Sequence, residues 1–165
     1  MKKGIYMDNI VFRKSIKEDI PTINALFIKM VEEINRKMVN EGVEPYTNLE
    51  NGFEEDYLDS FYENKDNIIF VAEHNNKVIG FLSVNNYKED GYIYLDDYYI
   101  REEYRGKGIG SELMNMAISY AKEDHVDRIM THVESANKSS IDFYKNRGFQ
   151  TEEVQGHRLF IKKTL

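Results

Sequence analysis

The sequence predicts an α+β fold, in which helices cover a β-sheet, within one domain spanning residues 1–165. Segments with helical and with strand periodicity alternate in a mixed order, and no internal repeat or low-complexity tract interrupts them. A length of 165 residues fits one compact domain. Hydrophobic residues make up 41% of the chain, which is enough for a globular core and excludes wholesale disorder.

A short strand and a long amphipathic helix are predicted first. The strand covers Ile10 to Arg13. Ser15 and Glu18 then have the spacing of a capping box, and Pro21 suits the first turn of a helix. The helix is expected to end before Gly42. Its apolar residues recur at every third or fourth position, at Ile23, Phe27, Met30, Ile34 and Met38.

A second helix and three strands are predicted next. The helix covers Phe53 to Tyr62 and places its apolar residues on one face. The strands are expected at Asn67 to Glu73, Val78 to Tyr87 and Gly91 to Ile100. The first two are joined by His74 to Lys77, in which two adjacent asparagines readily accept the positive φ of a hairpin turn.

The last third of the chain predicts a helix, a strand, a helix and two more strands. The helix from Ile109 to Tyr120 and the strand from Arg128 to Val133 are close enough for a parallel crossover. A helix from Lys138 to Arg147 follows and ends at Gly148. The chain closes with two strands, Phe149 to Val154 and His157 to Lys162.

Composition excludes several classes of protein. The chain has no cysteine and 2 prolines, which excludes disulfide frameworks, cysteine-ligated zinc and collagen-like structures, and its 4 histidines form no metal-ligand set. With 22 basic and 29 acidic residues and no basic cluster, a nucleic-acid partner is not expected. The longest apolar run, Ile68 to Ala72, is far shorter than the roughly 20 residues of a membrane span. Lys2 and Lys3 precede no apolar segment, so we expect a cytoplasmic protein without a membrane partner.

The most informative segment is a glycine-rich turn between a strand and a helix. It reads Arg105-Gly106-Lys107-Gly108-Ile109-Gly110-Ser111. Alternate glycines let the backbone approach a ligand closely, and the first N–H groups of a helix have no intrahelical acceptor. Together with the helix dipole, these groups favour a phosphate or pyrophosphate. A turn without a ligand is the alternative.

Spacing excludes two nucleotide-binding motifs at this turn. A dinucleotide fingerprint starting at Gly106 or Gly108 would need glycine or alanine at Ser111 or Leu113, and a phosphate loop needs Gly-Lys-Ser/Thr. The turn instead matches Arg/Gln-x-x-Gly-x-Gly/Ala, the signature of the GNAT superfamily of N-acetyltransferases, at Arg105, Gly108 and Gly110.

A second motif extends this resemblance. The GNAT superfamily typically ends with an Asn, a Tyr and a Gly-Phe pair, which here are Asn137, Tyr144 and Gly148-Phe149. The resemblance implies a GNAT-like three-layer fold, with a mixed, mostly antiparallel sheet of six to seven strands flanked by about four helices. It also implies that acetyl-CoA, the cosubstrate, enters where the sheet opens beside the fourth strand. The cofactor-binding residues that it implies are Tyr98, Tyr99, Ile100, Arg105 to Ser111 and Asn137.

Acetyl transfer from a thioester to an amine requires a base. A lysine-like amine has a pKa of about 10.4, so it is mostly protonated at neutral pH. The resemblance suggests Asp96 as the base, or the position of Tyr94, which cannot serve at its normal pKa. His132 is the second candidate. By the same resemblance, it lies at a position where ribosomal-protein N-terminal acetyltransferases of this family have a Glu-based arrangement, and the ordinary pKa of a histidine is about 6.5. Asp96 and His132 are equal candidates, and each could instead make only a structural hydrogen bond.

Two further groups are needed, an acid and an oxyanion-binding donor. Tyr144 is the expected acid, because a phenol with a pKa near 10 is protonated at pH 7, although it could simply pack in the core. Asn137 could cap the following helix and bind the pantetheine arm. A backbone N–H near Tyr98 to Ile100, where strands of the family bulge, is expected to bind the oxyanion. Glu102 replaces a proline common in the family, which affects only loop stiffness.

The acceptor is suggested by an acidic segment. Glu41 to Glu63 contains eight acids and no lysine or arginine, in the region that borders the acceptor in the family. It favours a cationic amine on a small molecule or a peptide, unless it is only a solvated helix face. Tyr46, Phe53 and Tyr57 could add cation–π contacts or pack in the core. A non-catalytic module that senses acyl-CoA or binds a protein is the competing function, and a homodimer is possible.

Overall fold

The described part of the chain folds around a seven-stranded sheet. The computed structural model describes residues 9–46 and 61–165, in which the sheet has the order β1-β2-β3-β4-β5-β7-β6. Only β4 and β5 pair in parallel, and the other neighbours are antiparallel, as expected for a mixed sheet. The strands are β1 (Ile10–Lys14), β2 (Ile68–His74), β3 (Lys77–Tyr87), β4 (Tyr92–Ile100), β5 (Arg128–Glu134), β6 (Gln150–Gln155) and β7 (Arg158–Thr164).

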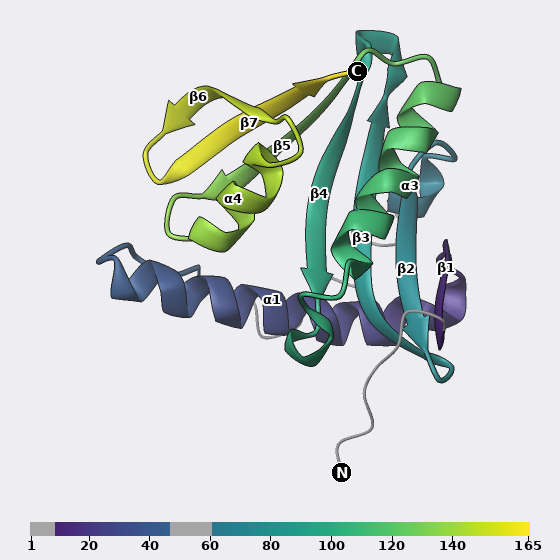
Figure 1. Cartoon of the computed structure of the whole chain (residues 1–165), viewed down its shortest axis with the longest axis horizontal. Helices are drawn as coiled ribbons and strands as arrows, with labels where there is room; N and C mark the ends of the chain where they lie inside the picture. Colours follow the sequence, from purple (N-terminus) through teal and green to yellow (C-terminus); the bar gives the residue numbers. More distant parts are fainter. Residues whose placement is uncertain (1–8, 47–60) are drawn as a thin grey trace.

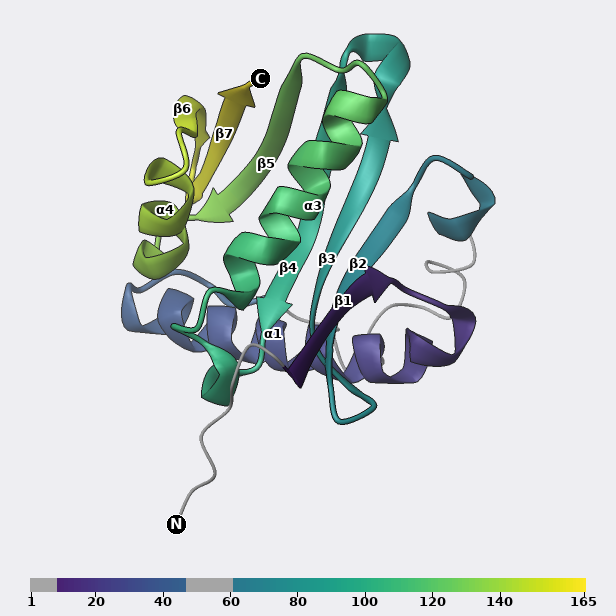
Figure 2. The same cartoon turned by 45° about the vertical axis from the view of Figure 1, so that its right-hand side comes forward.

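Helices cover both faces of the sheet, which gives three layers (Figures 1 and 2). They are α1 (Ile20–Asn40), α3 (Ile109–Glu123) and α4 (Lys138–Lys145). The apolar run in β2 shows how the layers form, because successive side chains of a strand point to opposite faces. Ile68, Phe70 and Ala72 pack in the cluster that holds α3 and Tyr144. Ile69 and Val71 pack in the cluster that holds α1.

The start of α1 differs from the predicted capping box. The hydroxyl of Ser15 lies 2.5 Å from the hydroxyl of Tyr62. A 3-10 turn precedes the helix instead, and the carboxylate of Asp19 accepts a hydrogen bond from the N–H of Ile16 at 2.8 Å. The capping prediction was therefore wrong, because the hydroxyl finds a tertiary partner. Pro21 does lie in the first turn of α1, as predicted.

The predicted turns are confirmed where they fall on described residues. Asn75 and Asn76 have φ values of 50° and 61° in the hairpin between β2 and β3. Gly148 ends the last helix region with φ 84°. The predicted helix from Phe53 to Tyr62 lies outside the described residues except for its last two, and residues 61–63 are helical. No helix in the described ranges is both long and apolar enough to cross a bilayer.

The sheet opens between β4 and β5. These strands pair only from Tyr92 to Leu95, opposite Arg128 to Thr131. In the pairing of β3 with β4, Leu82 faces Tyr98 and Val84 faces Leu95, so two residues of β4, Asp96 and Asp97, oppose one residue of β3. This β-bulge bends β4 just where its pairing with β5 ends. The candidate functional site lies in the resulting opening.

Candidate active site

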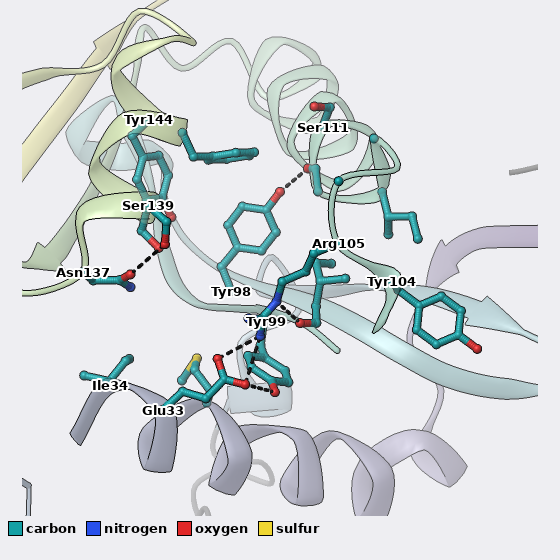
Figure 3. A pocket seen from close by; sticks show the side chains of 18 of the residues that line it. Glu33, Ile34, Tyr98, Tyr99, Tyr104, Arg105, Ser111, Asn137, Ser139 and Tyr144 are labelled. Atoms are coloured by element: carbon teal, nitrogen blue, oxygen red, sulfur yellow. Dashed lines mark hydrogen bonds and ion pairs between the residues drawn. The ribbon is translucent and has the colours of Figure 1, made fainter. Parts of the chain in front are cut away.

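Two adjoining cavities lie in the opening between β4 and β5. The first, of about 350 Å³, extends from the glycine turn before α3 to α4 and is bordered by α1 (Figure 3). The second, of about 310 Å³, extends from the end of β5 to the same part of α1. Several residues line both cavities, namely Met30, Ile34, Tyr98, Asn137, Ser140 and Tyr144. Met30 and Ile34 were expected only as part of an apolar helix face, and here that face borders the site.

The glycine turn presents an unsatisfied helix N-terminus to the first cavity. Gly108 is the N-cap of α3 with φ 84°, a conformation that favours glycine. The carbonyl of Gly108 accepts from the N–H of Glu112 at 3.1 Å, so the N–H groups of residues 109–111 precede the first intrahelical bond. A Cβ on Gly110 would lie 3.0 Å from the hydroxyl of Tyr98. The turn therefore has both the donors and the close packing that a phosphate cradle requires.

Two arginines lie near this turn, and they make different contacts. Arg105 forms an ion pair with Glu33 of α1 at 2.9 Å and donates from Nε to the carbonyl of Ile100 at 2.8 Å (Figure 3). Arg147 donates to the hydroxyl of Ser111, and its guanidinium lies 3.5 Å from the ring centroid of Phe143. Arg105 thus fixes the turn against α1, whereas Arg147 lies beside the helix N-terminus. Lys107 is exposed and is not among the residues that line the cavity.

Tyr144 lies at the junction of the two cavities. Its side chain is 6% exposed and borders both of them. Burial raises its pKa, and a hydrogen bond with Thr131 opposes that change only in part. The rings of Tyr98 and Phe149 lie edge-on to it, with centroids at 6.5 Å and 5.1 Å. The phenol is therefore protonated near neutral pH and held in one orientation.

Two adjacent carboxyl groups line the second cavity. Consecutive strand residues normally point to opposite faces, but the bulge of β4 directs both Asp96 and Asp97 to this cavity. Asn85 donates to Asp96 at 3.3 Å. Burial, and then repulsion from Asp96, raises the pKa of Asp97 to about 8. Sequence reasoning missed Asp97, although two acids inside an aromatic strand are an unusual pattern that could have indicated it.

His132 is held by Tyr94. The hydroxyl of Tyr94 lies 2.6 Å from Nδ1 of His132, which lines the second cavity. Burial, together with Arg158, lowers the pKa of His132 below 6.5. Burial, together with Asp96, raises the pKa of Tyr94 to about 12. His132 is therefore neutral at pH 7.

A buried acid closes the far end of the second cavity. Glu134 is 5% exposed and accepts hydrogen bonds from Tyr46 and Arg158, and His157 lies against its other oxygen. Burial opposes its ionisation, but Tyr46 and His157 bring its pKa below the ordinary value. The guanidinium of Arg158 lies 5.4 Å from the ring centroid of Tyr46, so one face of this ring is already covered. Phe53 and Tyr57 lie outside the described residues.

Strand alternation shows which backbone N–H groups of Tyr98 to Ile100, the segment predicted to bind the oxyanion, point away from β3. The N–H of Arg101 donates to the carbonyl of Ile79 in β3 at 2.9 Å. Alternate residues of an antiparallel strand direct their backbone groups to opposite sides, so the N–H groups of Tyr98 and Ile100 face away from β3, toward the opening. The N–H of Tyr99 faces β3, like that of Arg101, and the hydroxyl of the Tyr99 side chain donates to Glu33 of α1 at 2.7 Å.

In residues 9–46 and 61–165, no group of three or more potential metal ligands occurs.

Comparisons with known proteins identify one family. The model of the Acetyltransferase (GNAT) family matches residues 34–149. The chain is 34% identical over 90 residues to an uncharacterized N-acetyltransferase of Methanocaldococcus jannaschii, covering 52% of this chain and 40% of that protein. It is 31% identical over 98 residues to streptothricin acetyltransferase A of Bacillus subtilis, covering 59% of this chain and 56% of that protein. The chain thus spans about half the length of these curated relatives.

The fold is shared with solved structures of the same kind. One is the PaiA N-acetyltransferase of Thermoplasma acidophilum in complex with coenzyme A, with a TM-score of 0.70 and 21% sequence identity. The alignment covers 94% of this chain and 99% of that chain. The resemblance stated from the sequence is confirmed for the family and for the fold.

Proposed function

The chain belongs to the GNAT family of acetyltransferases, and on this premise we propose that it transfers the acetyl group of acetyl-CoA to a primary amine. The observation that carries the proposal is the position of Tyr144, whose buried phenol borders both cavities. One cavity begins at an unsatisfied helix N-terminus, and the other contains two carboxyl groups. The phenol therefore lies where a phosphate-bearing donor and a cationic acceptor would meet.

The first cavity suits acetyl-CoA, which is the cosubstrate. The N–H groups of residues 109–111 and the guanidinium of Arg147 would hold the diphosphate, since both bind phosphate oxygens well. Asn137 would contact the pantetheine arm, because it lines both cavities between the turn and Tyr144. Acetyl-CoA supplies the activated thioester, and the chain supplies its orientation.

Asp97 fits the role of base better than the two residues first considered. A general base works best when its pKa is close to the working pH. The carboxyl of Asp97 has a pKa of about 8, whereas His132 has a lowered pKa and is already bonded to Tyr94. Asp96 would act mainly through its negative charge, which raises the pKa of Asp97. His132 stays an alternative that the pH dependence of the rate distinguishes.

The proposed step is a direct attack. The amine gives a proton to Asp97, and its nitrogen forms a bond with the thioester carbonyl carbon. The N–H groups of Tyr98 and Ile100 face the opening and would stabilise the oxyanion. The carbon–sulfur bond then breaks, and Tyr144 donates its proton to the thiolate. The nitrogen, which entered as an ammonium group and lost its first proton to Asp97, gives its second proton to the phenolate of Tyr144. The products are an amide and the thiol of coenzyme A.

The acceptor is proposed to be cationic. The second cavity contains Asp96, whose negative charge raises the pKa of Asp97, and the net charge of the chain is −7. Such a field attracts ammonium groups and repels acids. One curated relative is named for streptothricin, which supports a small-molecule acceptor, but a peptide amine fits the same chemistry.

A screen with purified protein tests the function. Acetyl-CoA is incubated with polyamines, aminoglycosides and peptides, and thiol release and product mass are recorded. We expect acetylation of at least one cationic acceptor and none of acidic analogues, with a rate that falls as salt increases. Binding of acetyl-CoA without thiol release from any amine would instead support a non-catalytic acyl-CoA sensor.

A further inference from the structure

The side chain of Asn137 does not cap the helix that it begins. Asn137 is the N-cap residue of α4, but its side chain makes no capping hydrogen bond. Its Oδ1 instead accepts from Nζ of Lys37 at 2.9 Å and from the hydroxyl of Ser139 at 3.3 Å (Figure 3 shows the second contact). The oxygen of this amide therefore has two donors, both from side chains.

The contact with Lys37 determines which way the amide faces. A lysine side chain has donors and no acceptor once protonated, so the atom opposite Nζ must be the amide oxygen. The amide nitrogen, Nδ2, then points away from Lys37, and it donates no hydrogen bond to any residue in the described ranges. Asn137 lines the first cavity, so this cavity contains an unused pair of N–H donors.

Lys37 is itself well placed by α1. It lies one helical turn after Glu33, which binds both Arg105 and Tyr99 and so fixes this face of α1 against the opening. Lys37 lines the first cavity, and burial, together with Arg105, lowers its pKa. Sequence periodicity gave no indication of this role, because its partner is 100 residues away in the chain.

We infer that Lys37 is a positioning residue for the cosubstrate: it orients the amide of Asn137 so that Nδ2 donates to a carbonyl oxygen of the pantetheine arm. The inference rests on the proposed function, which puts that arm in the first cavity. Without Lys37, the amide could rotate and present its oxygen, which repels a carbonyl. Lys37 therefore acts through Asn137 and not through a phosphate.

Binding of coenzyme A and of its nucleotide half tests the inference. Lys37→Met keeps the aliphatic stem and removes the donor, and Lys29→Met is the matched control, since Lys29 is exposed on the same helix. The ligands are coenzyme A and 3′-phosphoadenosine 5′-diphosphate, which lacks the pantetheine arm, measured by calorimetry. We expect Lys37→Met to weaken coenzyme A binding about five- to tenfold, as for one buried hydrogen bond, and to leave the nucleotide unchanged. Lys29→Met should change neither.

Further variants separate this role from a structural one. Lys37→Arg keeps a donor and should restore part of the affinity. In an Asn137→Ala background, Lys37→Met should cost nothing further, because the two residues act as one unit. In kinetics, Lys37→Met should raise KM for acetyl-CoA with little change in kcat.

Three outcomes overturn the inference. Equal weakening of both ligands would mean that Lys37 acts on phosphates, and unchanged binding of both would mean that it has no role. Additive losses in the double variant would show that Lys37 acts independently of Asn137. Failure of the unmodified protein to bind coenzyme A would reject the proposed function itself, which is a separate result. Thermal melting shows that each variant is folded.

Discussion

Replacing Asp97 by asparagine should raise stability and lower activity, both in a pH-dependent way. The carboxyl pKa is raised from 3.8 to about 8 by burial and by Asp96. A group whose pKa is higher in the folded state contributes stability that is fully present below the unfolded value and is lost as pH rises toward 8. The rise of this pKa from 3.8 to about 8, at about 1.4 kcal/mol per pH unit, sets an upper limit of about 6 kcal/mol for this loss. Asparagine has no such ionisation.

Urea unfolding at pH 4, 7 and 9 measures the stability effect. We expect Asp97→Asn to be close to neutral at pH 4 and to stabilise progressively at pH 7 and 9. The rate should show the opposite effect: kcat/KM of the unmodified protein rises through about pH 8, and the variant loses that rise with a decrease of about 10²- to 10⁴-fold. A stability change that is equal at all three pH values would refute the raised pKa. A rise in rate centred below pH 6.5 and retained in the variant would assign the base to His132.

Three other substitutions test separate parts of the site. Tyr144→Phe should lower kcat at least about tenfold with little change in acetyl-CoA affinity, because the ring still packs and only the proton donor is lost. Equal rates for the two proteins in steady-state assays would show that Tyr144 is not the acid. Gly108→Ala should cost about 1–2 kcal/mol in urea unfolding and weaken coenzyme A binding, because φ is 84° there; an unchanged midpoint would contradict the left-handed turn. Glu33→Gln should lower the free energy of unfolding by only about 0.5–1 kcal/mol, because the ion pair between Glu33 and Arg105 is partly exposed. A decrease above about 2 kcal/mol in urea unfolding would show that this contact does more than fix the turn.

Much of the fold was predictable because its signals are local. The asparagines at 75 and 76 adopt the positive φ that their side chains tolerate, and the glycine at 148 ends its helix region in the same way. The family was also predictable, since the turn at Arg105 to Ser111 and the motif from Asn137 to Phe149 each need only short-range spacing. Backbone donors at the start of a helix follow from helix geometry alone.

Three features could not be predicted from the sequence, and the reason is the same for each. The capping box at Ser15 was wrong because a hydroxyl takes whichever partner the tertiary structure brings near, here Tyr62. Asp97 was missed because strand alternation assigns it to the face opposite Asp96, and only the bulge beside Ser83 cancels that alternation. Lys37 was missed because its partner is Asn137, the N-cap residue of α4.

The sequence by itself determined the order of the elements, the glycine turn before α3 and the order of the two family motifs, because these depend on residues that are close in the chain. The tertiary structure decided which side chains share a cavity. The separation of β4 from β5 after Leu95, the orientation of Asp97 and the pairing of Lys37 with Asn137 are properties of the packed sheet and helices. They depend on contacts between residues far apart in the chain, which neither periodicity nor motif spacing encodes.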